Sequence, residues 1–311
     1  MFLPDKHRVF ILSFSKEDMK FDENLSSIHA YLCADGYVIK NPNSQRHKYY
    51  RIGLRNNNSV LLKDFQNKFF MVFGVVPRLI LGERCEIGSK EIYERLSKTF
   101  GSFYSWEWKM PKLNKKLTKI WLRSYFDCEG WVFCKSHKNR HVGADCVNEK
   151  GLDQIIDEMN KIGIRTIKKY NKKRNIYRIL IYGKDNLNKF FKLIGFLHPD
   201  KLKKLKEILE DFIVYEWSFP QEEEKCKKFI KELLNEKIRI KKPYYARIIS
   251  KEENNLKKLN KWLKYFYNIE GRINKGVNGR GTIYFELNIN KKKDIENLIN
   301  NKIINNILIN K

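Results

Sequence analysis

Apolar and polar residues follow a helical period in two similar stretches of this chain. The first is LSSIHAYLCADGY (25–37) and the second is LTKIWLRSYFDCEGW (117–131). Hydrophobic residues at steps of three and four predict an amphipathic helix in each stretch. Each predicted helix ends on an acid followed by a glycine, and the two acids are Asp35 and Glu129. An acid at this end faces the negative end of the helix dipole, so we expect a cation nearby.

The elements that follow the two helices also come in the same order. After each helix the pattern predicts two strands, a helix that ends at a glycine, two more strands and a closing helix. In the first copy these lie at 37–40, 49–55, 60–73, 78–81, 85–87 and 89–100, after an opening strand at 8–14; in the second they lie at 131–135, 141–147, 151–162, 164–182 (a hairpin) and 185–194. The same interval of 55 residues separates Asp35 from Lys90 and Glu129 from Lys184. We therefore predict an α+β fold with two tandem αββαββ halves, 1–110 and 111–219, each a twisted sheet with helices on one face.

A further region begins after Pro220, where the charge becomes mixed in QEEEKCKKFIKELL. The pattern predicts a strand at 244–250, a helix at 252–266, a hairpin at 269–289 and a helix at 291–299. This order matches the later part of each half. We interpret 220–311 as a small basic α/β domain, with a degenerate third half-repeat that lacks the acidic motif as the alternative.

The charge of the chain indicates a polyanionic partner. It carries 63 lysine and arginine residues against 36 acids, a net charge of +27, which favours nucleic acid ahead of a membrane surface. No apolar run approaches the length of a spanning helix, and the N-terminus lacks the order of a signal peptide. The six cysteines form no CxxC pair. These features predict an intracellular, cytoplasmic protein with reduced thiols.

The two motif helices carry small residues four positions apart, Ala30 and Ala34 in the first and Ser124 and Cys128 in the second. Such stripes allow two helix backbones to approach closely. If the stripes face each other, Asp35 and Glu129 meet at one end of the interface. Two neighbouring carboxylates repel each other, so a proton or a divalent cation is needed between them. In a basic protein that meets phosphates, Mg²⁺ is the natural ion.

Basic residues on the predicted strands and turns, some of them interleaved with tyrosines, are candidates for nucleic-acid contact. They are Lys40, Lys48, Arg51, Arg55, Lys135, Lys138, Arg140, Lys168, Lys169, Lys172, Lys173, Arg174 and Arg178. The alternative for the run KKYNKKRNIYR is a solvated hairpin. A second alternative is zinc at the C-x2-H-x3-H-x4-C set formed by Cys134, His137, His141 and Cys146. Because alternate side chains of a strand point to opposite faces, we favour a DNA-facing loop there.

With these motifs, residues 20–215 resemble the single-chain LAGLIDADG homing endonucleases. IHAYLCADG and LRSYFDCEG are similar to the two family motifs, and the repeat order agrees. The second motif is the closer match, with Ser124, Phe126, Asp127, Cys128, Glu129 and Gly130. The first retains Ala34, Asp35 and Gly36 but has Cys33 where the family usually has an acid.

The resemblance implies metal-dependent cleavage of both strands of DNA. The pseudo-twofold sheets would form a DNA-binding saddle over the major groove. Asp35 and Glu129, with the main-chain carbonyls of Ala34 and Cys128, would hold Mg²⁺, for which Mn²⁺ would substitute. The family often places a lysine near the metal-bound water. Its nearest matches here are Lys201 and, in the first half, Lys109; the symmetric pair Lys90 and Lys184 is the alternative.

We therefore expect a monomeric, site-specific homing endonuclease, a hydrolase acting on DNA. It is expected to be intron-encoded, because Met1 opens the chain without a splicing Cys or Ser and INK closes it without His-Asn. The alternative is a nucleic-acid-binding protein on the same fold that does not cleave, either an RNA maturase that binds intron RNA or a DNA-binding regulator.

Overall fold

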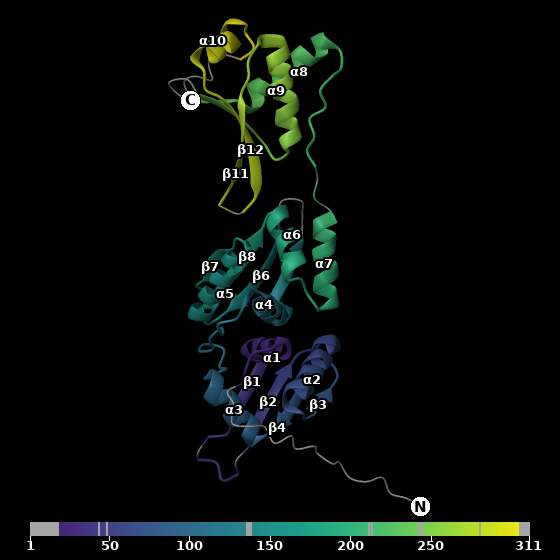
Figure 1. The fold of residues 1–311 in the computed structure, drawn as a ribbon, viewed down its shortest axis with the longest axis vertical. Coiled ribbons are helices and arrows are strands. Elements are labelled where there is room, and N and C mark those ends of the chain that lie inside the picture. Colours follow the sequence, from purple (N-terminus) through teal and green to yellow (C-terminus); the bar gives the residue numbers. More distant parts are fainter. Residues whose placement is uncertain are drawn as a thin grey trace, which may run out of the picture. The chain divides into compact units, whose positions relative to one another are not determined.

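The computed structural model describes residues 19–304 apart from 43, 48, 135–138, 211, 213, 242–244 and 280. The strand predicted at 8–14 therefore lies outside the described residues. The chain divides into two compact units, Met1–Asp211 and Phe212–Lys311. We describe each unit by itself (Figure 1).

The first unit contains two copies of one αββαββα arrangement. The first copy is α1 (Glu23–Cys33), β1 (Gly36–Lys40), β2 (Tyr50–Arg55), α2 (Ser59–Phe73), β3 (Arg78–Ile80), β4 (Arg84–Gly88) and α3 (Lys90–Phe100). The second copy is α4 (Lys115–Glu129), β5 (Gly130–Cys134), β6 (Arg140–Cys146), α5 (Glu149–Lys161), β7 (Ile167–Asn171), β8 (Ile176–Tyr182) and α6 (Lys184–Leu193), followed by α7 (Pro199–Glu210). Both sheets are antiparallel, with strand orders β1-β2-β4-β3 and β5-β6-β8-β7. The predicted α+β fold with two repeated halves is confirmed.

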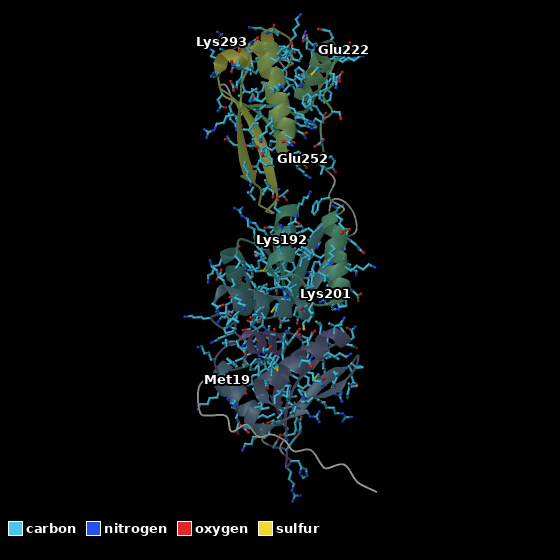
Figure 2. The ribbon with its side chains drawn as sticks, turned by 45° about the vertical axis from the view of Figure 1, so that its right-hand side comes forward. Met19, Lys192, Lys201, Glu222, Glu252 and Lys293 are labelled. Carbon is cyan, nitrogen blue, oxygen red and sulfur yellow. The ribbon has the colours of Figure 1, made fainter. Side chains whose placement is uncertain are left out.

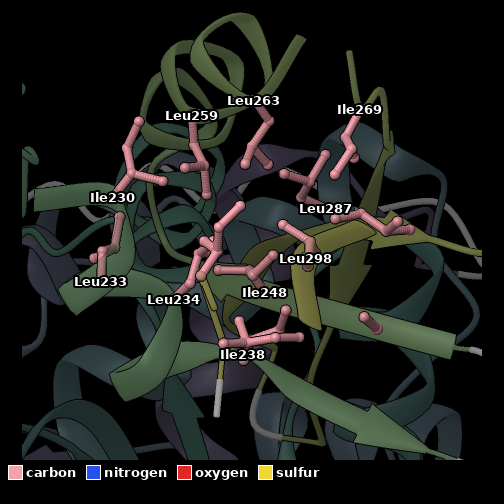
Figure 3. Close-up of a cluster of buried hydrophobic side chains, with 14 of the residues drawn as sticks. Ile230, Leu233, Leu234, Ile238, Ile248, Leu259, Leu263, Ile269, Leu287 and Leu298 are labelled. Atoms are coloured by element: carbon pink, nitrogen blue, oxygen red, sulfur yellow. The ribbon is translucent and has the colours of Figure 1, made fainter. Parts of the chain in front are cut away.

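The second unit forms α8 (Glu223–Lys237), β9 (Arg239–Lys241), β10 (Tyr245–Ser250), α9 (Glu253–Tyr267), β11 (Arg272–Val277), β12 (Ile283–Ile289) and α10 (Lys292–Asn300). Two of these elements, α8 and β9, add to the predicted ones. The antiparallel sheet has the order β9-β10-β12-β11. Its own core lies between the helices and one face of the sheet, where Leu234 of α8, Leu263 of α9 and Leu298 of α10 meet Ile248 and Leu287 of the strands (Figure 3).

The glycine after each motif acid is required by close packing at the turn from helix to strand. A Cβ on Gly36 would lie 2.4 Å from the Cα of Leu32, and one on Gly130 would lie 2.3 Å from the carbonyl oxygen of Phe126. Real Cβ atoms do not approach backbone atoms so closely. Each motif strand can therefore start directly against the end of its helix, which fixes where the acid before it lies.

Candidate active site

The helices α1 and α4 pack against each other and form the centre of the first unit. Every residue of α1 from Leu25 to Cys33 is buried, because one side of the helix meets its own sheet and the other meets α4. In the interface, Trp121 Nε1 of α4 donates a hydrogen bond to His29 Nδ1 of α1 at 3.1 Å. Ser124, one of the predicted small residues, is 2% exposed. The close pairing that the small residues predicted is therefore present.

His29 is held neutral in this interface. An indole N–H can only donate, so the Nδ1 atom that faces Trp121 has to be unprotonated. The Sγ atom of Cys33 lies 3.4 Å from the same nitrogen. Burial lowers the pKa of His29 to about 3, in agreement with this geometry.

The two motif acids lie at the ends of the paired helices. Asp35 occupies the turn between α1 and β1, where its Oδ2 accepts a hydrogen bond of 2.8 Å from Asn56 Nδ2. Glu129 is the last residue of α4. Burial, and after it the charge of Asp35, raises the pKa of Glu129 to about 7. The carboxylate of Asp35 is thus close enough to raise the pKa of Glu129.

Lys201 lies near the start of α7 (Figure 2), and its amine covers the carboxyl end of α4. Its Nζ donates to the carbonyl oxygens of Asp127 at 2.5 Å and Cys128 at 3.0 Å. Burial lowers the pKa of the Lys201 amine, whereas its charge lowers the pKa of Glu129. Lys201 is the cation expected near the helix end. The same amine also bonds to the carbonyl oxygen of Cys128, the main-chain metal ligand that the family resemblance implies.

The segment before α7 is tied to the same helix end. The Oδ1 atom of Asp127 accepts hydrogen bonds from the backbone N–H groups of Leu197 at 2.8 Å and His198 at 2.9 Å. Burial raises the pKa of Asp127 to about 6, while these two bonds oppose the rise. The ring of His198 reaches the first half, where its Nε2 lies 3.3 Å from Asn58 Nδ2. Residues 197–201 therefore bond to the end of α4 in the second half and also reach the first half.

The other predicted lysines have different surroundings. Lys109 is exposed between Trp108 and Met110, whose backbone groups bond to Asn148 and Gln154 at the start of α5. Among the described contacts, none brings Lys109 to either motif acid. The exposed Lys90 lies 3.7 Å from Glu94, and Lys184 begins α6. Of the four lysines, only Lys201 is among the charges that shift the pKa of Glu129.

The carboxylates fit a small, hard divalent cation. Within the described residues, no group of three His, Cys, Asp or Glu side chains is arranged to hold a metal. Mg²⁺, however, usually takes only one or two protein carboxylates and completes its shell with water and phosphate oxygens. Burial and the charge of Asp35 both disfavour the ionised form of Glu129. A divalent cation bound beside the two carboxylates would stabilise that ionised form.

The uncovered faces of the two sheets carry some of the predicted DNA-binding residues. Arg51 and Arg55 alternate with the buried Ile52 and Leu54 of β2, so they project from the face opposite the core. Arg84 lies opposite Arg55 on β4 and adds a basic side chain that the sequence reasoning missed.

In the second half, Lys169 and Arg178 stand opposite each other on the corresponding face. Arg178 donates two hydrogen bonds to Asp145, of 2.6 and 2.8 Å, which neutralise much of its charge. The exposed turn between β7 and β8 contains Lys172, Lys173 and Arg174.

Three of the predicted DNA contacts are not supported. Arg140 is only 5% exposed, because it lies on the same side of β6 as the buried Val142. Lys168 pairs with Glu149 at 2.8 Å and Asp153 at 2.7 Å, both on α5, and so lies on the helix-covered side. Lys40 is opposite Tyr50, whose ring contacts Tyr93 of α3. Lys48, Lys135 and Lys138 lie outside the described residues.

The cysteine and histidine set of β5 and β6 does not converge. His141 is packed among the rings of Trp131, Phe133 and Tyr182 on the uncovered face. Cys146, five residues further along β6, points to the opposite face, and His137 lies outside the described residues. All six cysteines are free thiols. Within the described ranges, no helix combines the length and apolar character needed to cross a bilayer.

Comparison with known proteins places the second half in a known family. Residues 118–195 match the LAGLIDADG-like domain. The chain is 28% identical over 135 residues to homing endonuclease I-ApeI of Aeropyrum pernix, covering 40% of this chain and 60% of that protein. It is 26% identical over 210 residues to the replication factor C small subunit of Methanocaldococcus jannaschii, covering 64% of this chain but 11% of that protein. A structure of the homing endonuclease I-DmoI in complex with DNA and Ca aligns over 59% of this chain and 99% of that one, with 16% identity and a TM-score of 0.45.

Proposed function

Because this chain belongs to the LAGLIDADG homing endonuclease family, we propose that it cleaves double-stranded DNA at a specific site with the help of Mg²⁺ or Mn²⁺. The observation that carries the proposal is the placement of Asp35 and Glu129 at the ends of the paired helices α1 and α4, where the charge of Asp35 raises the pKa of Glu129. As part of the same proposal, the protein acts inside the cell, where its DNA lies, and is encoded within an intron.

The residues around the two acids have separate tasks in this proposal. The amide of Asn56 holds one oxygen of Asp35 and so fixes the direction in which the carboxylate points. Lys201 fixes the end of α4, and therefore Glu129, through the carbonyls of Asp127 and Cys128. A divalent ion bound by Asp35 and Glu129 would supply a water of lowered pKa and positive charge for the phosphate.

Binding and chemistry are then divided between the sheet faces and the helix ends. Basic side chains on the uncovered sheet faces, among them Arg51, Arg55 and Lys169, would neutralise phosphates and set the register of the duplex. The acids at the helix ends would meet the backbone of the duplex between the two sheets. This division predicts that removing an acid abolishes cleavage without abolishing binding.

A plasmid that carries the intron-less allele of the insertion site tests the proposal. With Mg²⁺, Asp35→Asn and Glu129→Gln are each expected to reduce the cleavage rate by about 10²-fold or more, as for the loss of one electrostatic catalytic group. Binding to the same DNA, measured in Ca²⁺ or EDTA, should persist. The matched control is Asp157→Asn, which removes an exposed acid of α5. Wild-type cleavage by both site variants would refute the assignment of the metal site.

A second function is favoured by one observation, which is that the charged amine of Lys201 lies at the end of α4. The amine of Lys201 offsets the charge of Glu129 and occupies the carbonyl of Cys128. The fold is therefore compatible with a protein that binds nucleic acid and does not cleave it, such as a maturase for intron RNA or a DNA-binding regulator. A splicing assay with the host intron RNA separates the maturase from the nuclease: stimulated splicing together with intact plasmid would select the maturase.

A further inference from the structure

The second unit has the strand order of each half of the first unit. Its sheet runs β9-β10-β12-β11, which matches β1-β2-β4-β3 and β5-β6-β8-β7 when the strands are counted from the start of each unit. A helix precedes the first strand, another joins the second and third strands, and a third follows the last. All the strands are antiparallel. The match extends over the whole second unit, including α8 and β9.

The helix α8, which takes the position of the motif helices, is built differently. It buries a single stripe of Cys226, Ile230, Leu233 and Leu234 and exposes charged residues elsewhere. By contrast, α1 is buried along both sides because it pairs with α4. In place of an acid, Ile238 stands before the first strand, 4% exposed. Within the described residues of the second unit, α8 therefore has neither the two-sided burial of α1 nor an acid directly before the first strand.

The sheet of the second unit carries a row of three arginines and one buried asparagine, one residue from each of its four strands. Arg239 of β9 is opposite Arg247 of β10, Arg247 is opposite Asn288 of β12, and Asn288 is opposite Arg272 of β11. On both sides of the row, the residues one position along each strand face the core; they are Ile240, Ala246, Ile248, Ile273, Leu287 and Ile289. Because alternate side chains of a strand point to opposite faces, the row projects from the face without helices.

This row is not explained by the stability of the sheet. Like charges directly opposite each other are destabilising, and Arg239 stands opposite Arg247. One acid, Glu286, reaches Arg247 at 3.2 Å. Arg239 and Arg272 are exposed and form no ion pair within the described part of the unit. The unit as a whole holds 22 lysine and arginine residues against 12 acids. An anion on the uncovered face would offset the repulsion.

The dimensions of the row fit a duplex. Adjacent strands lie about 4.8 Å apart, so the row spans roughly 14 Å from the first strand to the fourth. The major groove of B-DNA is about 12 Å wide and is bordered by phosphates on both sides. Arg239 and Arg272, at the two ends of the row, are therefore spaced to meet phosphates across a groove. Tyr245, Asn274 and Tyr284 add polar and aromatic side chains to the same face.

We propose that residues 212–311 are a third αββαββ unit that binds double-stranded DNA through the uncovered face of its sheet and does not cleave it. Arg239 and Arg272 are the phosphate contacts in this proposal, and Arg247 and Asn288 lie between them. The binding surface adds to that of the first unit. It shares with the proposed function only the choice of DNA as partner and does not depend on cleavage.

The salt dependence of binding to a random-sequence DNA duplex tests the surface on the full-length chain. The double variant Arg239→Gln/Arg272→Gln should reduce the slope of log K against log salt by about 2, since each lost phosphate contact contributes about 0.9. Arg239→Lys/Arg272→Lys should retain the wild-type slope, because the charges remain. The matched control is Lys258→Gln/Lys261→Gln, which removes two exposed charges from α9 on the helix-covered side.

The outcomes separate the surface from a general effect of charge. An unchanged slope in the arginine double variant, or an equal loss in the α9 control, would overturn the proposal. A loss that is seen with duplex RNA but not with duplex DNA would assign the face to RNA instead. Circular dichroism of the variants checks that they fold. Because the probe is not a cleavage substrate, a failure here leaves the proposal for Asp35 and Glu129 unaffected.

Discussion

The hydrogen bond from Trp121 to His29 makes the pairing of α1 and α4 sensitive to acid. Burial lowers the pKa of His29 from 6.5 to about 3 in the folded chain. As the pH falls below 6.5, the unfolded chain binds a proton that the folded chain excludes, so stability is lost. With these two pKa values, the free energy of unfolding falls by about 2 kcal/mol between about pH 7.5 and about pH 5 through this residue alone.

The variant His29→Asn separates this effect from other titrations. The asparagine oxygen lies near the position of Nδ1 and can accept from the indole, but it does not titrate. Loss of the ring contacts with Phe100 and Phe103 destabilises the variant at both pH values. The difference between the two proteins should therefore shrink by about 2 kcal/mol on acidification. Hydrogen exchange of the α1 and α4 amides, corrected for intrinsic rates, measures both free energies.

The matched control is His47→Asn, which alters an exposed histidine and should leave the pH dependence unchanged. If wild type and His29→Asn lose the same free energy on acidification, His29 is not held neutral by the fold. The assigned direction of the hydrogen bond from Trp121 would then be wrong as well.

Three further predictions concern the helix ends. Lys201→Met should destabilise the first unit by about 1–3 kcal/mol in urea unfolding, because buried carbonyls of α4 lose their donor. Gly36→Ala should destabilise it by about 1–3 kcal/mol or more, because the new Cβ would clash with backbone, whereas Gly279→Ala, where nothing lies within 4 Å, should be neutral in the same assay. The raised pKa of Glu129, about 7, means that the folded chain retains a proton that the unfolded chain loses above 4.5, so stability without metal should decrease as the pH rises from about 4.5 to 7. Over the upper part of that range, Mn²⁺ affinity measured by calorimetry should increase, and Glu129→Gln should abolish the increase.

The order of the elements could be predicted because it depends on local patterns. Helical periods, alternating strands and the glycines that end helices are each read within a window of a few residues. The strand order in a sheet depends instead on pairings between distant residues, which leave no comparable local signal. The same limit explains why Asn56 was missed, since its partner Asp35 lies 21 residues earlier in the chain.

The direction of each basic side chain was predicted less well than its position. Arg140 lies on the same side of β6 as Val142 and Ala144, so the alternation alone placed it with apolar residues. Which of the two faces meets the helices is decided only when α5 packs on the sheet. That packing also brings Glu149 and Asp153 to Lys168. A charge run on a strand therefore divides between both faces, and only half of it is available to a partner.

The two motif acids are equivalent in sequence but not in their surroundings. Asp35 is held by a neutral amide, that of Asn56, whereas the backbone beside Glu129 is held by the charged amine of Lys201. An amide orients a carboxylate without changing the net charge around it, whereas an amine competes directly with a bound cation. Burial and the charge of Asp35 raise the pKa of Glu129 even though the amine of Lys201 opposes the rise. A cation between the helix ends would therefore stabilise the ionised form of Glu129. At the same helix end, however, the carbonyl oxygen of Cys128 already accepts a hydrogen bond from Lys201. In the first half, the carboxylate of Asp35 is held by a neutral amide, so no amine competes with the cation there.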